Sequence, residues 1–309
     1  MTEQGVGVIF GLLSRLTFHD KMCIFRIYQR VLASAKGRGS PMTSIQRVCI
    51  FSNQLRRSLE TAETLTCRLE QKGFQVSENV TADTDLIVSI GGDGSFLKTM
   101  NDLNYPSIPV VSINTGHLGF FSEVNPDQIN TLLERLEHNH FFIESMAPLK
   151  AVVTTGDQIT EVKAINELVI KSNQVKAIHL RVKVNGQLIE RFSGDGIIIS
   201  TSAGSTAYSY STGGSIVDPR IDVLQLTPLA PINTNSYRCF TSSVIFPPDG
   251  CINISPQREP EGYVLVSTDG IPVAVDYFDQ ISVTLDQNKI QMLRLKQHDF
   301  WNKVVKKFV

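Results

Sequence analysis

Asp85-Leu-Ile-Val-Ser-Ile-Gly-Gly-Asp-Gly-Ser-Phe-Leu-Lys98 is the stretch of sequence that indicates the fold. Its residues 86–90 are apolar, rich in β-branched side chains and bounded by turn residues, which is typical of an internal strand in a parallel sheet. Three glycines follow, and their missing Cβ atoms allow a sharp turn and a close approach of a ligand to the backbone. We expect a helix to begin near Ser95 and to direct its free N–H groups and positive dipole end at the turn. The stretch therefore predicts a strand, a phosphate-facing turn and a helix, in that order.

One acidic residue, Asp93, stands in the middle of this glycine turn. A carboxylate in direct contact with phosphates would weaken their binding. It is useful, however, where it accepts a proton from an attacking hydroxyl group or helps to hold a metal ion. An ordinary strand-to-helix turn can also carry an Asp as the N-cap of its helix. The turn by itself leaves both interpretations of Asp93 open.

The composition is that of an ordinary soluble protein. The chain has 309 residues, of which 42% are hydrophobic and 19% are charged, and its net charge is −1. This length is sufficient for two domains with hydrophobic cores. The near-neutral charge gives no electrostatic basis for binding nucleic acid or a membrane surface, and no apolar run approaches the roughly 18 residues of a membrane helix. We therefore expect no nucleic-acid or membrane partner.

The cysteines and histidines form no disulfide or metal-binding pattern. The five cysteines are odd in number and scattered without a C-x-x-C pair, and the histidines form no H-x-x-x-H pair. This pattern argues against a disulfide framework or a zinc site and favours a reducing compartment. We expect a cytoplasmic protein with no dedicated cluster of metal ligands.

Residues 1–41 differ in charge from the rest of the chain, because they contain six basic residues and two acidic ones. Three interpretations compete for this extension. It could be a helical extension, a basic amphipathic targeting segment, or upstream sequence translated from a wrongly chosen start. The third is favoured because Met42 stands just before the first clear strand.

Residues 42–146 alternate between predicted strands and predicted helices. The strands are expected over 47–52, 74–76, 86–90 and 108–113, and leucines at helical spacing predict a helix that Gly73 closes. The last strand leads into a second glycine loop, Asn114–Gly119, and Asn125 and Pro126 are typical first residues of a further helix. This alternation predicts an α/β domain with a parallel sheet. Both glycine loops would lie at the carboxyl ends of strands, where open α/β sheets bind ligands.

Residues 147–290 have the pattern of a β-rich domain, and residues 291–309 that of a helical tail. Asn185-Gly186 between two alternating runs is a strong hairpin signal. The tail contains apolar and basic residues and the single tryptophan, Trp301. It could be a membrane-surface helix, but a terminal helix that packs on the body of the protein is favoured. The strands are predicted over 149–154, 160–171, 177–184, 187–192, 196–201, 264–267, 273–275 and 281–285.

The stretch Ser193–Gly214 combines a second Gly-Asp-Gly with a dense run of Gly, Ser, Thr, Ala and Tyr. Small residues permit a close backbone approach, hydroxyl groups donate to phosphate or ribose, and Tyr208 offers a stacking face for a base. A flexible linker could share this composition, but the apolar run at 197–199 argues against one. We interpret the stretch as a binding segment.

Asn166 and Glu167 are adjacent polar residues inside a predicted apolar strand. Because neighbouring strand residues face opposite sides, at least one of the two should point inward. A buried carboxylate needs partners, and bidentate hydrogen bonding to ribose hydroxyl groups would supply them. The other interpretation is a bulge or a strand end that faces solvent.

Four separated segments together resemble the ATP-dependent NAD kinases, most of all the compact bacterial members. They are GGDGSF at 91–96, NTGHLGF at 114–120, INELV at 165–169 and GDGIIISTSAGSTAYS at 194–209. The resemblance covers about residues 42–309. It implies an α/β domain and a β-rich domain with NAD bound between them, and transfer of the γ-phosphoryl group of ATP to the 2′-hydroxyl of the adenosine ribose. It also implies a homodimer or homotetramer.

The resemblance assigns roles to individual residues. It makes Asp93 the general base, places Asn166 and Glu167 on ribose hydroxyl groups, and places Asp195 near the nicotinamide end. Ser193 stands where many bacterial members have Arg, so any charge contact from that position is absent. The other implied dinucleotide- and phosphate-binding residues are Gly91, Gly92, Gly94, Lys98, His117, Ser193, Thr206, Ala207, Tyr208, Ser209, Tyr210, Ser211 and Ala230.

A divalent metal ion is expected with the substrate rather than in a site of the protein. The chain has neither a Walker lysine motif nor a cluster of metal ligands, so Mg²⁺ or another divalent ion is expected to arrive mainly with ATP.

A lipid or sugar kinase could use the same GGDG turn, but it would leave Asn166-Glu167 and the GSTAYS run unexplained. A non-catalytic dinucleotide-binding regulator is the second alternative, and the presence of Asp93 in a complete set of motifs argues against it.

Overall fold

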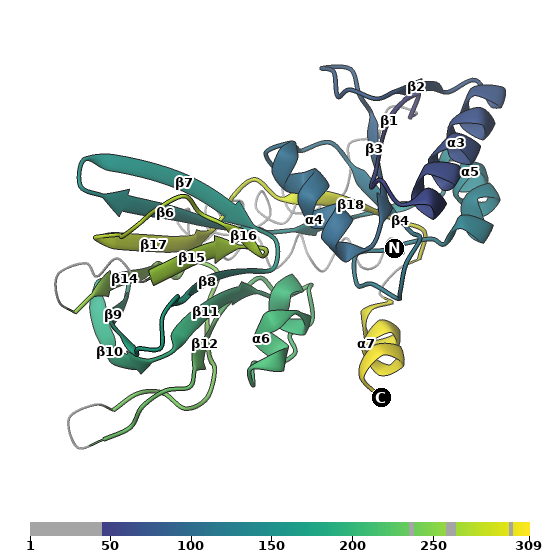
Figure 1. Ribbon diagram of the computed structural model, residues 1–309. Helices are drawn as coiled ribbons and strands as arrows, with labels where there is room; N and C mark the ends of the chain where they lie inside the picture. The colour runs from purple at the N-terminus through teal and green to yellow at the C-terminus, as the bar shows by residue number, and fades with distance from the viewer. Residues whose placement is uncertain (1–44, 235–237, 258–263, 297–298) are drawn as a thin grey trace, which may run out of the picture. The chain divides into compact units, whose positions relative to one another are not determined.

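The computed structural model describes residues 45–234, 238–257, 264–296 and 299–309 (Figure 1). The extension predicted over residues 1–41 lies outside these ranges. The strands of the described part form three six-stranded sheets.

The first sheet has the strand order β2-β1-β3-β4-β18-β5. Its strands β1 to β4 are parallel, β18 runs parallel to β4, and β5 is antiparallel to β18. This confirms the predicted α/β domain with a parallel sheet. The strands are β1 (Arg47–Ser52), β2 (Gln75–Ser77), β3 (Leu86–Gly91), β4 (Val110–Asn114), β5 (Phe142–Met146) and β18 (Ile290–Arg294).

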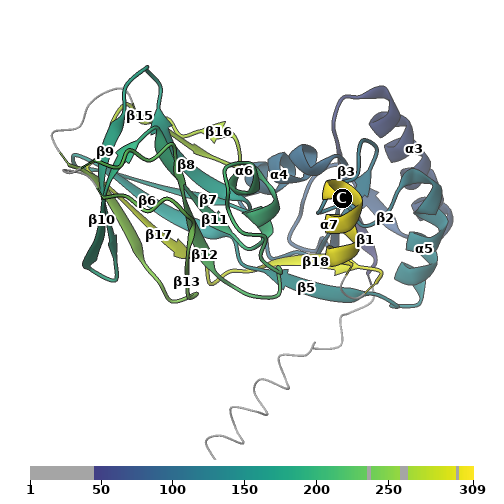
Figure 2. The ribbon, with the colours of Figure 1, turned by 90° about the horizontal axis from the view of Figure 1, so that it is seen from below.

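Helices cover both faces of this sheet, and every residue of its central strands β3 and β4 is buried. Helices α3 (Arg56–Gln71) and α5 (Ile129–Glu137), the latter preceded by the 3-10 turn η1 (Pro126–Gln128), pack on one face with Leu65, Leu69 and Leu132. Helix α4 (Asp93–Asp102) packs on the other face through Phe96 and Met100. Figure 2 shows α3 and α5 side by side. The carboxyl ends of β3 and β4, where Gly91 pairs with Asn114, carry the two glycine loops as predicted.

The remaining strands form two antiparallel sheets, which confirms the predicted β-rich region. Their orders are β10-β9-β14-β17-β6-β7 and β13-β12-β11-β8-β15-β16. Buried residues of both sheets belong to one core cluster, so the sheets pack face to face. The strands are β6 (Leu149–Thr155), β7 (Gln158–Ala164), β8 (Glu167–Ser172), β9 (Ile178–Val184), β10 (Gln187–Gly194), β11 (Gly196–Thr201), β12 (Leu224–Leu229), β13 (Val244–Phe246), β14 (Ile252–Pro256), β15 (Val264–Thr268), β16 (Ile271–Pro272) and β17 (Gln280–Leu285).

The hairpin prediction at Asn185-Gly186 is confirmed. These two residues connect β9 to β10, and their φ angles are 50° and 82°. Such positive values are required at both central residues of the tight turn that joins antiparallel strands.

Two strand predictions are wrong. The single strand expected over 160–171 is two strands, β7 and β8, which belong to different sheets. The chain leaves its pairing with β6 after Ala164, because the Asp269 carboxylate accepts hydrogen bonds from the N–H groups of residues 165–167. The strand expected over 273–275 is also absent from these described residues, because the N–H of Val275 bonds to the carbonyl of Val273 in a tight turn. Residues 271–272 form the short strand β16 in its place.

The helical tail predicted over 291–309 begins with strand residues. Residues up to Arg294 complete β18, because Ile290, Met292 and Leu293 are buried in the first sheet. The helix, α7, spans Phe300–Phe308 and buries Val304. Within the described ranges, no helix has the length and apolar character needed to cross a membrane.

Candidate active site

The carboxylate of Asp93 is held by the loop that follows β4. Helix α4 begins at Asp93 with Gly92 as its N-cap residue, so the interpretation of Asp93 as a helix cap is wrong. Its Oδ2 atom accepts the N–H of Phe120 at 2.8 Å, and its Oδ1 atom accepts the N–H of Phe121 at 3.1 Å. Each oxygen of an ionised carboxylate can accept a further hydrogen bond. Asp93 is therefore oriented and still able to accept a hydroxyl proton.

The local sequence explains why this loop lies so close to Asp93. Strands β3 and β4 are adjacent and parallel, so the chain after β4 passes the start of α4. A Cβ atom at Gly119 would lie 2.1 Å from Asp93 Oδ1, which only glycine avoids. The ring of Phe121 stacks on Phe96 of α4, with 4.7 Å between the ring centroids. The loop is thus fitted to α4 on both sides of the carboxylate.

The three glycines of the first turn have different roles. Gly91 has a φ of 154°, and a Cβ atom there would lie 2.2 Å from Ser95 Oγ. Gly91 is therefore required by the fold itself. A Cβ atom at Gly92 or Gly94 would meet nothing within 4 Å. The backbone at these two positions is open to a ligand.

Asn166 and Glu167 are both buried, with 8% and 6% of their surfaces exposed. The solvent-facing interpretation is therefore wrong. The carboxylate of Asp269 accepts the N–H of Ile165 at 2.8 Å and that of Asn166 at 2.7 Å, which holds the chain where it passes from β7 to β8. Asn166 Oδ1 and Glu167 Oε2 have no hydrogen-bond partner among the described residues. Buried polar atoms without partners are costly, and a bound ligand with hydroxyl groups would satisfy them.

Burial changes the protonation of two neighbouring acids, Glu167 and Asp269. It raises the pKa of Glu167 to about 8, to which the nearby Asp269 carboxylate also contributes, while a hydrogen bond from the Tyr208 N–H opposes the shift. Burial likewise raises the pKa of Asp269 to about 6, against the three backbone N–H groups that it accepts. Glu167 is consequently largely neutral at pH 7. A neutral carboxyl group offers one O–H donor and one carbonyl acceptor to a ligand.

The Gly/Ser/Thr/Ala/Tyr run lies directly beside Asn166 and Glu167 and is ordered. It forms the 3-10 turn η2 (Ala203–Thr206) and the short helix α6 (Tyr208–Ser211). A Cβ atom at Gly204 would lie 2.0 Å from the carbonyl oxygen of Asn166, and Thr201 Oγ1 donates to the carbonyl of Ile165 at 2.5 Å. The run is therefore packed against the Asn166–Glu167 segment, and the linker interpretation is wrong.

Asp195, Tyr208 and Ala230 line one open cavity of about 720 Å³. Ala230 follows β12 with a φ of 42°, an uncommon value for a residue other than glycine. Tyr208 is exposed, and its backbone N–H donates to Glu167. The other lining residues are Lys171, Ser172, Gln174, Val175, Lys176, Ala177, Thr212, Pro228, Leu229 and Ile232.

Three expected site residues have contacts elsewhere in the protein. Lys98 forms an exposed ion pair of 2.7 Å with Asp102 one helical turn away. Ser193 is buried in β10, and its N–H donates to Cys239 Sγ. Ser209 is buried, and its hydroxyl group contacts Thr227 Oγ1 at 3.0 Å. Of the other expected residues, Thr206 is buried, Ala207 is partly exposed, and His117, Tyr210 and Ser211 are exposed.

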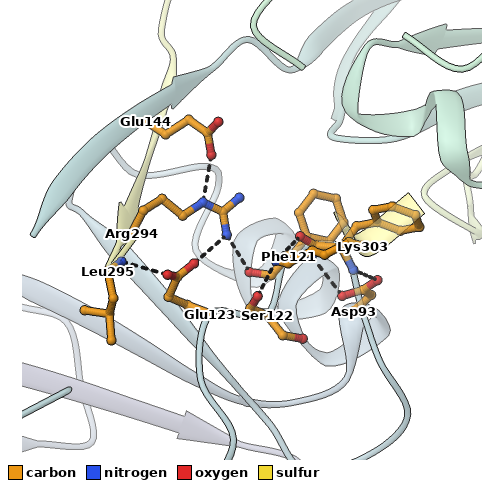
Figure 3. A network of polar contacts seen from close by, with 9 residues as sticks. Asp93, Phe121, Ser122, Glu123, Glu144, Arg294, Leu295 and Lys303 are labelled. Atoms are coloured by element: carbon orange, nitrogen blue, oxygen red, sulfur yellow. Dashed lines mark hydrogen bonds and ion pairs between the residues drawn. The ribbon is translucent and has the colours of Figure 1, made fainter. Parts of the chain in front are cut away.

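Several residues that hold the site together carry no predicted role in the sequence. Asp269-Gly270 forms the turn between β15 and β16, with φ angles of 49° and 80°, and the Asp-Gly pair was a usable turn signal. Arg294 and Lys303 lie beside the Asp93 loop (Figure 3). No local pattern could have identified these two cations, because the return of β18 to the first sheet places them there.

The donor set around Asp93 does not resemble a resident metal site. Among residues 45–234, 238–257, 264–296 and 299–309, no three His, Cys, Asp or Glu side chains are grouped so that they could hold a metal ion. Both oxygens of Asp93 already accept backbone N–H groups.

Two protein-family models match the chain. The ATP-NAD kinase N-terminal domain matches residues 28–141, which begins inside the 1–41 extension, and the ATP-NAD kinase C-terminal domain matches residues 165–295. The NAD kinase of Finegoldia magna is 34% identical over 84% of this chain and 97% of its own length. The NAD kinase of Streptococcus agalactiae serotype Ia is 33% identical over 85% of this chain and 95% of its own length.

Solved structures share the fold. Yeast NADH kinase, complexed with NADH, is 22% identical, covers 86% of this chain and 88% of its own, and has a TM-score of 0.75. An NAD kinase from Archaeoglobus fulgidus, in complex with ATP, is 24% identical, covers 85% of this chain and 98% of its own, and has a TM-score of 0.67. The family models, the curated relatives and the two-domain fold agree, and the chain belongs to the NAD kinase family.

Proposed function

We propose that this enzyme transfers the γ-phosphoryl group of ATP to the 2′-hydroxyl of the adenosine ribose of NAD, which forms NADP. The observation that supports NAD as the substrate is the buried pair Asn166–Glu167. The Oδ1 atom of Asn166 and the Oε2 atom of Glu167 have no partner among the described residues and lie beside the Tyr208 segment. A ribose diol has the donors and acceptors that would complete these atoms. Neither a lipid nor a sugar-phosphate substrate accounts for this pair together with the Tyr208 segment.

Asp93 is the proposed general base. A ribose hydroxyl is a poor nucleophile near pH 7, and a carboxylate within hydrogen-bond reach orients it and accepts its proton as the phosphoryl group transfers. Two N–H groups hold the Asp93 carboxylate in one orientation, which favours such positioning. Most of the acceleration is expected from orientation and charge neutralisation.

The dinucleotide is proposed to extend from Glu167 into the cavity lined by Asp195, Tyr208 and Ala230. Tyr208 supports this proposal because its N–H donates to Glu167 while the exposed residue also lines the cavity. The open backbone at Gly92 and Gly94 is proposed to face the phosphates. Mg²⁺ is proposed to enter as the Mg–ATP substrate.

The proposed reaction is tested by offering NAD, diacylglycerol and a sugar phosphate in parallel with labelled ATP and Mg²⁺. We expect label in NADP alone and no transfer when the divalent ion is chelated. Label in lipid or sugar phosphate would overturn the substrate assignment. Tight NAD binding without NADP formation would instead indicate a dinucleotide-binding regulator.

Assembly and location are proposed on separate grounds. A homodimer or homotetramer follows from the family resemblance and is checked by light scattering of the purified chain. The cytoplasmic location rests on the scattered cysteines, of which Cys49, Cys67, Cys239 and Cys251 are free in the described residues. Fluorescence microscopy of the tagged full chain checks it.

A further inference from the structure

The loop segment that holds Asp93 is itself held from its other side by the C-terminal helix. Lys303 of α7 donates from Nζ to the carbonyl oxygen of Phe120 at 3.0 Å and to that of Ser122 at 2.5 Å (Figure 3). These carbonyl groups alternate along the chain with the N–H groups that bind Asp93. The segment therefore lies between one cation and one carboxylate.

One peptide unit connects Lys303 to Asp93 directly. It is the unit between Phe120 and Phe121, whose carbonyl oxygen accepts from Lys303 Nζ and whose N–H donates to Asp93 Oδ1. The peptide group is planar and conjugated. A cation at its oxygen and an anion at its N–H polarise it in the same direction, so each hydrogen bond strengthens the other. Lys303 thus acts on Asp93 through a single rigid group.

The neighbouring cation, Arg294, holds the next carbonyl group. Its Nη1 atom donates to the Phe121 carbonyl at 3.1 Å, while its Nε atom donates to Glu144 at 2.7 Å and Nη1 also approaches Glu123. Arg294 is thus largely neutralised by carboxylates. Lys303, in contrast, directs its hydrogen bonds to carbonyl oxygens, so that its charge acts on the loop backbone.

Lys303 is charged at neutral pH although it is largely withdrawn from water. Burial and then the nearby Arg294 lower its pKa to about 8, and Glu123, Asp299 and Asp93 oppose this shift. An ammonium group in such surroundings is costly unless its donors are satisfied. Here the Phe120 and Ser122 carbonyl groups satisfy two of its three donors.

The docking of α7 does not depend on the ammonium group. Phe308 packs on Tyr210 of α6 with 4.3 Å between ring centroids, and Phe300 packs on Phe120 with 6.0 Å. Trp301 Nε1 donates to Asp218 at 3.0 Å, and Val304 is buried. These contacts would keep the helix in place if the charge at position 303 were removed.

We propose that Lys303 is a positioning residue for the general base. Its ammonium group holds the Phe120–Phe121 peptide unit so that the unit's N–H fixes the Asp93 carboxylate toward the ribose hydroxyl. The inference rests on the proposed function for its catalytic consequence and on the contacts of α7 for its structural part. It assigns a role to the last helix of the chain, which is remote in sequence from every motif of the site.

The test compares Lys303→Met, which keeps the aliphatic stem, with Lys303→Arg, which keeps the charge and the donors. Lys306→Met is the matched control, because Lys306 is exposed on the same helix. We expect Lys303→Met to lower kcat by about ten- to a hundredfold, the range associated with small misplacement of a catalytic group. KM and Kd for NAD should change by less than about twofold, since uniform substrate binding is untouched. Lys303→Arg should recover most of kcat, and Lys306→Met should match the wild type.

A second readout does not require activity. Hydrogen–deuterium exchange of the peptide that covers residues 119–124 should be faster in Lys303→Met than in the wild type or Lys306→Met, because the segment loses the two hydrogen bonds from Lys303. Exchange of the peptides that cover 300–308 should be unchanged. If Lys303→Met does not fold, as judged by circular dichroism, Lys303→Gln, which removes the charge but keeps an amide donor, tests the contribution of the charge, and wild-type kcat in that variant would overturn the role of the ammonium group.

Three outcomes would overturn the inference. They are wild-type kcat in Lys303→Met, unchanged exchange over residues 119–124, and a loss of kcat that Lys303→Arg fails to restore. Failure of the proposed function looks different. In that case the wild type forms no NADP, while the exchange comparison still decides whether Lys303 holds the Asp93 loop.

Discussion

The backbone N–H of Glu167 donates a hydrogen bond of 3.3 Å to the carboxylate of Asp269. This contact brings two acidic residues together at the point where the chain passes from one antiparallel sheet to the other. Asp269 holds the crossing, and its charge together with burial keeps Glu167 largely neutral. Stability and ligand binding are therefore connected at this place.

The first prediction concerns stability between about pH 6 and 8. Burial raises the pKa of Glu167 to about 8, so in this window the folded state binds a proton that the unfolded state has lost. Stability must then fall as pH rises, by on the order of 1 kcal/mol per pH unit. Glu167→Gln removes this slope, because its amide does not titrate. Urea unfolding of the ligand-free proteins at several pH values checks this, and equal slopes for both proteins would contradict it.

The second prediction is that Asp269→Ala destabilises the fold by about 2–4 kcal/mol, because it leaves backbone N–H groups of residues 165–167 buried without an acceptor. Asp276→Ala is the control, since Asp276 is exposed on the segment after β16. Its effect should stay within about 0.5 kcal/mol. Denaturant midpoints of the two variants make the comparison, and equal midpoints would show that Asp269 does not support the crossing.

The third prediction concerns the proton acceptor. Asp93→Asn should lower turnover by at least roughly two orders of magnitude, as expected for loss of a general base, while NAD still binds. Asp102→Asn alters a carboxylate on the same helix that is exposed and paired with Lys98, and it should retain wild-type turnover. NADP formation measures kcat and calorimetry measures NAD binding. Near-wild-type turnover in Asp93→Asn would exclude Asp93 as the base.

The fourth prediction uses two glycines of the same loop. A Cβ atom at Gly119 would lie 2.1 Å from Asp93 Oδ1, whereas the nearest atom to one at Gly116 is Asn114 Oδ1 at 3.9 Å. Gly119→Ala should therefore displace the carboxylate and lower kcat by about a hundredfold, and Gly116→Ala should have little effect on kcat. Steady-state kinetics at saturating NAD and Mg–ATP test the pair. Similar values for both variants would mean that the loop yields without moving Asp93.

The fifth prediction separates folding from phosphate binding. A Cβ atom at Gly94 meets nothing in the protein, and Ala is the better helix former, so Gly94→Ala should not lower the thermal midpoint. If the backbone there faces the phosphates, the added methyl group obstructs the substrate, and kcat/KM should fall. Unchanged kcat/KM for both NAD and ATP would remove Gly94 from the binding surface.

The parallel sheet and its two glycine loops could be predicted from the sequence because their signals are local. The apolar run of β3 and the glycines after it specify a buried strand and a turn within a few residues. Asn125 and Pro126 specify the start of a helix in the same local way. The break at Asn166 could not be predicted in this way. Residues 160–171 read as one strand, and the acceptor that interrupts it, Asp269, comes 103 residues after Asn166.

The sequence by itself determined the family motifs and the strand–turn–helix unit around Asp93, and it favoured an inward-facing side chain at Asn166 or Glu167, because these depend on residue type and short spacing. Only the tertiary structure decided what holds them. Strand β18 returns to the first sheet and brings Arg294 and Lys303 to the loop whose N–H groups bind Asp93. The physical reason is that a hydrogen bond to a backbone carbonyl requires a donor of the right reach and charge but leaves no pattern in the sequence around either partner.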